Sequence, residues 1–171
     1  EQVKRVTLEL GGKSANVVFA DADIAAAAAA APYAVFDNAG QDCCARSRIL
    51  VERSAYDEFL THLQPAVEGL RVIDPVDEAS EMGPLISAQQ KQVVTGFLDE
   101  VEVAFAGSAP DGDGFWVPPS VVTVDDPGTR IWREEVFGPV VAVMPFDDEA
   151  DAIAKANDTE YGLSGSIFTT D

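Results

Sequence analysis

Apolar residues follow two repeating patterns along this chain. Short apolar runs bounded by turn residues predict buried strands, whereas apolar positions three or four residues apart predict helices. The strand pattern occurs at residues 6–10, 15–19, 47–52, 103–106, 116–124, 139–146 and 165–169. The helical pattern occurs at residues 21–38, 54–70, 87–102 and 148–157. Because strands alternate with helices, we expect a three-layer α/β/α fold around an open, largely parallel sheet.

Polar residues mark where the predicted helices begin. Asp21 and Asp23 precede a run of alanines and would cap the first helix, while Ser54 and Ser87 would cap the second and third. Pro32 lies inside the first helical segment. Because proline removes a hydrogen-bond donor from a helix, we expect a kink or a restart at this position.

Both cysteines of the chain lie between the first predicted helix and the strand at 47–52. The sequence Asn38-Ala39-Gly40 predicts a tight turn, since Asn and Gly tolerate positive φ, so Cys43 would lie on a loop held at both ends. Nearby arginines, Arg46 and Arg48, favour a reactive thiolate, and Asp42 opposes it. Cys44 leads into the strand pattern, and we expect it to be buried and inert.

The composition excludes several classes of function. Among 171 residues there are 30 Asp and Glu against 11 Lys and Arg, which gives a formal net charge of −19 at pH 7. Nucleic acids and anionic membranes attract basic surfaces, so neither is an expected partner. The sequence shows no apolar run of 18 residues and no signal peptide, and we therefore predict a soluble domain in the cytoplasm. The acidic excess fits a high-salt cytoplasm and an acidic proteome equally well.

Other local patterns carry little chemistry. Two adjacent cysteines and one histidine supply neither a zinc ligand set nor a disulfide framework, so we expect no metal. His62 lies off the apolar stripe of its helix and is predicted to be exposed. Gly11-Gly12-Lys13 lacks the spacing of a phosphate-binding P-loop, which leaves a tight turn or a close approach to a ligand. Residues 107–114 are predicted to form a surface loop.

Longer motifs occur along the chain in a fixed order. They are Glu9-Leu10-Gly11-Gly12-Lys13, Asn38-Ala39-Gly40-Gln41-Asp42-Cys43 and Glu134-Glu135-Val136-Phe137-Gly138-Pro139, followed by Asn157 and Tyr161-Gly162-Leu163. In these motifs the whole chain resembles the catalytic domain of the NAD(P)-dependent aldehyde dehydrogenase superfamily. The resemblance implies that residues 1–14 are the end of a cofactor-binding region. It also implies that residues 15–171 are a catalytic domain, incomplete at its C-terminus.

The resemblance implies a role for several individual residues. Cys43 would be the nucleophile, and Glu9 would be the general base for deacylation. Glu135 would bind the nicotinamide ribose, Phe137 would pack against the nicotinamide side, and the backbone of Leu10 would contact the carboxamide. The implied reaction is oxidation of a small aldehyde to a carboxylic acid with NAD or NADP, through a thiohemiacetal and a thioester. Each step needs a residue type that is present at the matching position.

The same resemblance implies partners that these residues do not include. An upstream dinucleotide-binding domain and a short C-terminal arm would be expected, and the intact enzyme would be a homo-oligomer. We therefore expect that the chain alone does not sustain aldehyde oxidation. Two other functions remain open. One is a cofactor-free cysteine esterase or hydrolase that uses Cys43 and Glu9, and the other is a catalytically silent module that pairs with a dinucleotide domain from another chain.

Asp42 suggests the class of substrate. A carboxylate beside a thiolate raises the thiol pKa unless a cation offsets it, and the ammonium group of a cationic aldehyde would do so. The motif from Asn38 to Cys43 is similar to that of aminoaldehyde and betaine aldehyde dehydrogenases, whereas Cys44-Ala45-Arg46 departs from it. The alternative is that Asp42 caps the local turn or pairs with an arginine.

Overall fold

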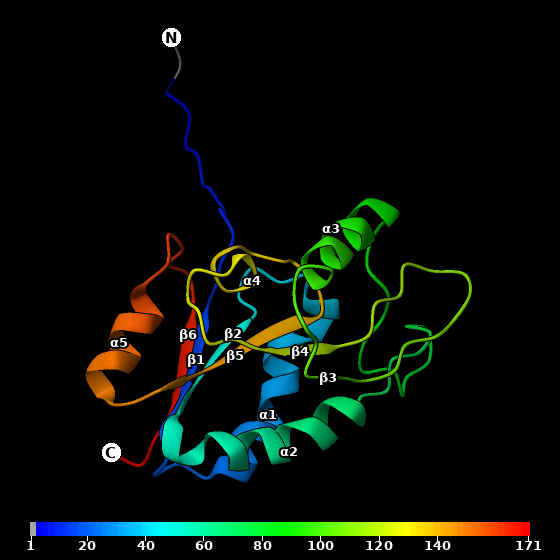
Figure 1. Ribbon diagram of the computed structural model, residues 1–171. Helices are drawn as coiled ribbons and strands as arrows, with labels where there is room; N and C mark the ends of the chain where they lie inside the picture. Colours follow the sequence, from blue (N-terminus) through cyan, green and yellow to red (C-terminus); the bar gives the residue numbers. More distant parts are fainter. Residues whose placement is uncertain (1–2) are drawn as a thin grey trace.

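The computed structural model describes residues 3–171, and its centre is one six-stranded sheet (Figure 1). The order across the sheet is β3-β4-β5-β2-β1-β6, and every neighbouring pair is parallel except β3 and β4. The strands are β1 (Ala15–Val18), β2 (Arg48–Glu52), β3 (Phe105–Ala106), β4 (Ser120–Thr123), β5 (Val140–Phe146) and β6 (Gly165–Phe168). The predicted open and largely parallel sheet is confirmed.

Helices cover both faces of this sheet. They are α1 (Ile24–Val35), α2 (Tyr56–Glu68), α3 (Ala88–Leu98), α4 (Arg130–Arg133) and α5 (Glu149–Asn157), with 3₁₀ turns η1 (Asp37–Gly40) and η2 (Arg53–Ala55). Parallel strands are joined by right-handed crossovers, so the direction of each step across the sheet decides which face its helix covers. The steps β1 to β2 and β2 to β4 run one way and carry α1 and α2, while β5 to β6 runs the other way and carries α5. The predicted three-layer arrangement follows.

The core lies where the central strands β2 and β5 meet the helices. Every residue of β5 is buried, as are the first four of β2, which explains why both strands are apolar without alternation. On α2, Phe59, Leu63 and Val67 lie at helical spacing and are all buried. His62, on the same helix, is exposed as predicted.

Two of the predicted helix caps are present. The side chain of Asp23 accepts a hydrogen bond from the amide of Ala26, and Ser87 accepts one from the amide of Gln90. The predicted cap at Ser54 is wrong. The η2 turn precedes α2, no side chain caps that helix, and the Ser54 hydroxyl donates instead to Glu52.

Several boundaries differ from the sequence patterns. Pro32 lies within α1, which continues to Val35 instead of restarting. Strands β3 and β4 are shorter than predicted, and α3 ends at Leu98. The expected strand at 6–10 is absent, and residues 3–10 are exposed. A strand needs a neighbouring strand to satisfy its backbone, and this segment projects away from the sheet (Figure 1).

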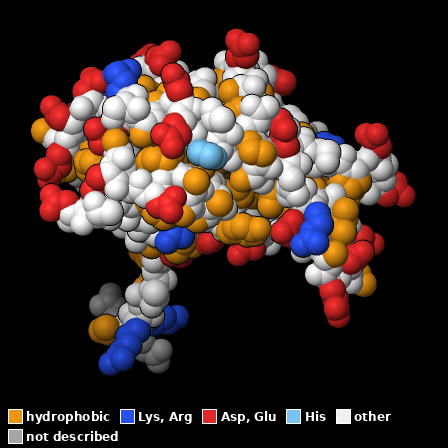
Figure 2. Space-filling view, turned by 90° about the horizontal axis from the view of Figure 1, so that it is seen from below, with side chains coloured by type: hydrophobic (Ala, Val, Ile, Leu, Met, Phe, Trp, Pro, Cys, Tyr) orange, Lys and Arg blue, Asp and Glu red, His pale blue; other side chains and the backbone are white. Residues whose placement is uncertain are grey.

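The surface carries the acidic excess of the sequence. Acidic side chains are spread over the face seen in Figure 2, and basic ones are few. Within residues 3–171, the helices are all too short or too polar to cross a bilayer.

Candidate active site

The loop that carries the cysteines is fixed by an unusual turn. Asn38 and Ala39 both have positive φ, 51° and 56°, and the side chains of Asn38 and Gln41 each donate to the other residue's carbonyl, at 2.9 and 3.1 Å. Gly40 follows, also with positive φ, and a β carbon there would overlap the carbonyl of Gly138. The turn therefore packs directly on the backbone that precedes β5, and Cys43 leaves it in a defined position.

The turn at Gly11 and Gly12 packs against the same loop. A β carbon on Gly12 would overlap the carbonyl oxygen of Cys43, so only glycine allows this close approach. The amide of Gly12 donates to the Glu135 carboxylate at 3.0 Å, and the amide of Gly11 donates to Glu9 at 3.2 Å. Three motifs distant in sequence thus meet at one place, and Gly11-Gly12 forms a turn that closely approaches the backbone of the cysteine loop.

Cys43 is half-buried at this meeting point. Its pKa is raised to about 11, first by burial, then by the adjacent Cys44 thiol, and then by the Glu9 carboxylate. The thiol of Cys43 and the carboxylate of Glu9, to which the resemblance assigns one reaction, therefore lie within interaction distance. The backbone N–H of Cys43 donates to no acceptor among residues 3–171.

Cys44 does not match its prediction. It is half-buried like Cys43, because the loop does not enter the core until Ala45. Burial therefore does not distinguish the two thiols.

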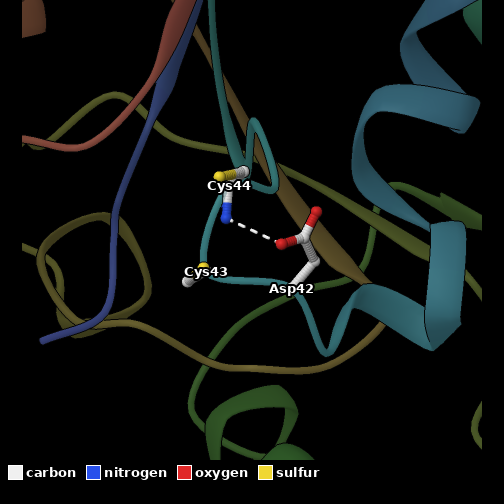
Figure 3. A group of neighbouring side chains, drawn as sticks. All are labelled: Asp42, Cys43 and Cys44. Atoms are coloured by element: carbon white, nitrogen blue, oxygen red, sulfur yellow. Dashed lines mark hydrogen bonds between the residues drawn. The ribbon is translucent and has the colours of Figure 1, made fainter. Parts of the chain in front are cut away.

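The side chain of Asp42 is used locally. It is exposed, and its Oδ1 accepts the Cys44 amide at 2.9 Å, as Figure 3 shows. This contact matches the capping alternative. No ion pair joins Asp42 to Arg46 or Arg48 within the described part of the chain. A role for Asp42 toward substrate stays a prediction.

Arg48 is buried beneath the loop, so it does not act as an exposed cation beside the thiol. Its guanidinium donates to the carbonyls of Lys13, Lys155 and Ala156, and it lies over the ring of Trp132 at 5.2 Å from the ring centroid. Burial lowers its pKa to about 10. Arg48 thereby ties β2 to the glycine turn and to the end of α5.

Lys13 is the site residue that sequence reasoning missed. Only 2% of it is exposed, and burial, followed by the charge of Arg48, lowers its pKa to about 7. It lines a cavity of about 400 Å³ together with Ser14, Asn157 and Tyr161. No sequence signal shows this burial, since a lysine after two glycines reads as a surface residue.

The residues expected to hold a nicotinamide cofactor offer exposed surface and an available carboxylate oxygen. Phe137 has positive φ and is 39% exposed, and the amide group of Gln90 fixes it by donating to its carbonyl at 2.8 Å. Leu10 is exposed. Glu135 uses Oε1 for the Gly12 amide, so Oε2 remains as an acceptor. An exposed ring at Phe137 and an available carboxylate oxygen on Glu135, two residues earlier in the chain, suit a nicotinamide riboside, so the residues fit the group.

A family model matches the full sequence. It is described as the aldehyde dehydrogenase family and covers residues 1–171. Two curated relatives from Rhizobium meliloti (strain 1021) are betaine aldehyde dehydrogenase 1, which is 39% identical, and betaine aldehyde dehydrogenase 2, which is 42% identical. Each alignment covers 99% of this chain but only 37% and 36% of the relative. The chain thus spans little more than a third of these proteins.

Solved structures give the same result. A betaine aldehyde dehydrogenase from Staphylococcus aureus in complex with NAD⁺ is 40% identical, with a TM-score of 0.90 over 95% of this chain and 34% of that one. An aldehyde dehydrogenase from Pseudomonas aeruginosa is 39% identical, with a TM-score of 0.93 over 98% and 36%. The gamma-glutamyl-gamma-aminobutyraldehyde dehydrogenase of Burkholderia cenocepacia is 38% identical, with a TM-score of 0.90 over 95% and 34%.

Proposed function

Because this chain belongs to the aldehyde dehydrogenase family, we propose that it carries the nucleophile and the base of an enzyme that oxidises an aldehyde to a carboxylic acid. The observation that supports this most directly is the position of Glu9 against the Cys43 thiol, since the two groups come from segments 34 residues apart. We also propose the expected division, with residues 1–14 ending a cofactor-binding region and residues 15–171 forming the catalytic portion.

Cys43 carries the covalent chemistry in this proposal. Its thiol loses a proton, the sulfur attacks the aldehyde carbon, and a C–S bond forms as the carbonyl oxygen becomes an oxyanion. The backbone N–H of Cys43, which has no acceptor among the described residues, follows the turn at Asn38–Gly40 and is a donor to that oxyanion. Because the pKa of Cys43 is raised, its thiol needs a base to accept the proton before the sulfur attacks.

Glu9 acts on the thioester that follows. One of its carboxylate oxygens accepts the Gly11 amide, which holds the side chain, and the other is left to take a proton from water. That water then attacks the thioester carbon, the C–S bond breaks, and the carboxylic acid and the Cys43 thiol are released.

NAD or NADP would be held by Glu135, Phe137 and the backbone of Leu10. When bound, the nicotinamide supplies the two-electron acceptor that the oxidation needs. The relatives named above include proteins described as betaine aldehyde dehydrogenases, which favours a small cationic aldehyde as substrate. This chain covers about a third of the length of these relatives. The proposal therefore also includes a dinucleotide-binding domain and assembly of the intact enzyme into a homo-oligomer.

The test is to add an intact dinucleotide-binding domain and to follow NADH absorbance with an aldehyde substrate. A loss of activity of at least about 100-fold in Cys43→Ala supports the proposal, since this substitution removes the nucleophile. Glu9→Gln is expected to retain the first turnover and to lose steady-state turnover. Ester cleavage without cofactor and without NADH formation would favour a cysteine hydrolase instead. The absence of both ester cleavage and NADH formation would favour a catalytically silent module.

The cationic substrate has a separate test in Asp42→Asn. The variant keeps an oxygen for the Cys44 amide and removes the charge. In the full-length enzyme, kcat/KM for 4-aminobutanal relative to butanal should fall by several-fold, whereas an unchanged ratio means that Asp42 does not recognise the ammonium group.

A further inference from the structure

Three consecutive residues of the cysteine loop bring three metal-ligating atoms together. A carboxylate oxygen of Asp42 and the sulfurs of Cys43 and Cys44 all lie within 4.8 Å of one another (Figure 3). Local sequence patterns predict no metal here, because the chain has no C-x-x-C spacing and no histidine near the cysteines.

The distances are close to those of a bound ion. A tetrahedral Zn²⁺ with sulfur ligands at about 2.3 Å holds its ligand atoms roughly 3.7 Å apart. The three side chains therefore need to approach one another by about 1 Å. They can do so by rotation, because Asp42 is exposed and both cysteines are only half-buried.

The donor set selects the class of ion. Two thiolates and one carboxylate match borderline and soft divalent cations, whereas Mg²⁺ and Ca²⁺ require oxygen ligands. The Glu9 carboxylate beside Cys43 adds a further negative charge, and the net charge of −19 raises the local concentration of cations. No ion pair among the described residues neutralises Asp42.

We propose that Asp42, Cys43 and Cys44 form a binding site for one thiophilic divalent cation, such as Zn²⁺ or Cd²⁺, with the fourth position open to solvent. Each thiol releases its proton to water as its bond to the metal forms, and no electrons are transferred. The ion withdraws electron density from the Cys43 thiolate through the metal–sulfur bond, so the bound sulfur is a weaker nucleophile. The metal would therefore inhibit the reaction, and this inhibitory role rests on the proposed function. Metal binding itself does not depend on that function.

Binding is measured with CdCl₂ alone by calorimetry on the reduced full chain, in excess MgCl₂ to occupy surface carboxylates. We expect one equivalent per chain. Cys44→Ser should weaken the affinity by at least about 10-fold, because it removes one of three ligands. Asp42→Asn should weaken it by several-fold while keeping its hydrogen bond to the Cys44 amide.

The matched control is Asp126→Asn. Asp126 also caps a turn, since its Oδ1 accepts the Gly128 amide at 2.8 Å, but it lies away from the cysteines. Its substitution should leave Cd²⁺ affinity unchanged. An affinity that is the same in Cys44→Ser as in the original chain, or that falls equally in Asp126→Asn, shows adsorption to the acidic surface and overturns the proposal.

The inhibitory consequence has its own measurement. Saturating Zn²⁺ should slow iodoacetamide alkylation of Cys43 by at least about 10-fold, and a chelator should restore the original rate. Metal binding without protection of Cys43 would overturn the inhibitory role. Neither measurement uses aldehyde turnover, so failure here is distinguishable from failure of the proposed function.

Discussion

The buried lysine under the glycine turn makes a quantitative prediction about stability. Lys13 has a pKa of about 7 in the folded protein, against 10.5 for an unperturbed lysine, chiefly because burial penalises its charge. Below pH 7 both states carry the proton, and the folded state bears the full cost of the buried charge. Between pH 7 and 10.5 the unfolded chain keeps a proton that the folded protein releases. Stability therefore rises with pH in this window.

The size of the effect follows from one proton. A full proton difference changes the free energy of unfolding by about 1.4 kcal/mol per pH unit. Between pH 7 and 8.5 we expect a gain of roughly 1.5 kcal/mol, since the release is incomplete at the lower end. The window stops there because Cys43 has a raised pKa and contributes the opposite slope above pH 9.

The assay is urea unfolding at intervals from pH 6 to 8.5, compared between the original chain and Lys13→Met. The methionine keeps most of the side-chain volume without the charge, so the variant should be more stable at pH 6 and should lose the slope above pH 7. Lys91→Met, a change of the same type on α3, is the control and should retain the slope. A flat profile in the original chain, or an unchanged slope in Lys13→Met, would refute the account of Lys13.

Three further predictions concern the site. Glu9→Gln should speed iodoacetamide alkylation of Cys43 at pH 8, because the Glu9 charge contributes to the raised pKa of that thiol. Glu102→Gln, which is remote from the thiol, should leave the alkylation rate unchanged. Equal rates in the original chain and in both variants would contradict the prediction. Gly40→Ala should destabilise the fold by at least about 2 kcal/mol, measured by thermal unfolding, because a β carbon would meet the Gly138 carbonyl at a positive φ. The chain alone should show no calorimetric NAD binding near a Kd of about 1 μM, which corresponds to roughly −8.2 kcal/mol, since few of the expected cofactor contacts are present.

The local patterns were sufficient for most of the architecture. The buried run at 139–146 became the wholly buried β5, and Ser87 capped the third helix as predicted. These features depend on neighbouring residues, so the sequence shows them directly. The strand expected at 6–10 did not form, because a local pattern does not show whether a partner strand is available. Its alternating pattern is local, but a strand also requires a partner, and no described segment lies beside it.

The site depended on contacts that no local pattern contains. The motifs named Cys43, Glu9 and Glu135 as candidates through a resemblance, but the hydrogen bond between Gly12 and Glu135 joins residues 123 positions apart. Likewise, Lys13 is buried in a cavity that it lines with the distant residues Arg48 and Asn157, and its pKa follows from that burial. The sequence alone therefore determined which residue types were available for the chemistry. Tertiary structure decided their charge states and which groups touch, because desolvation and Coulomb interactions depend on distances in space.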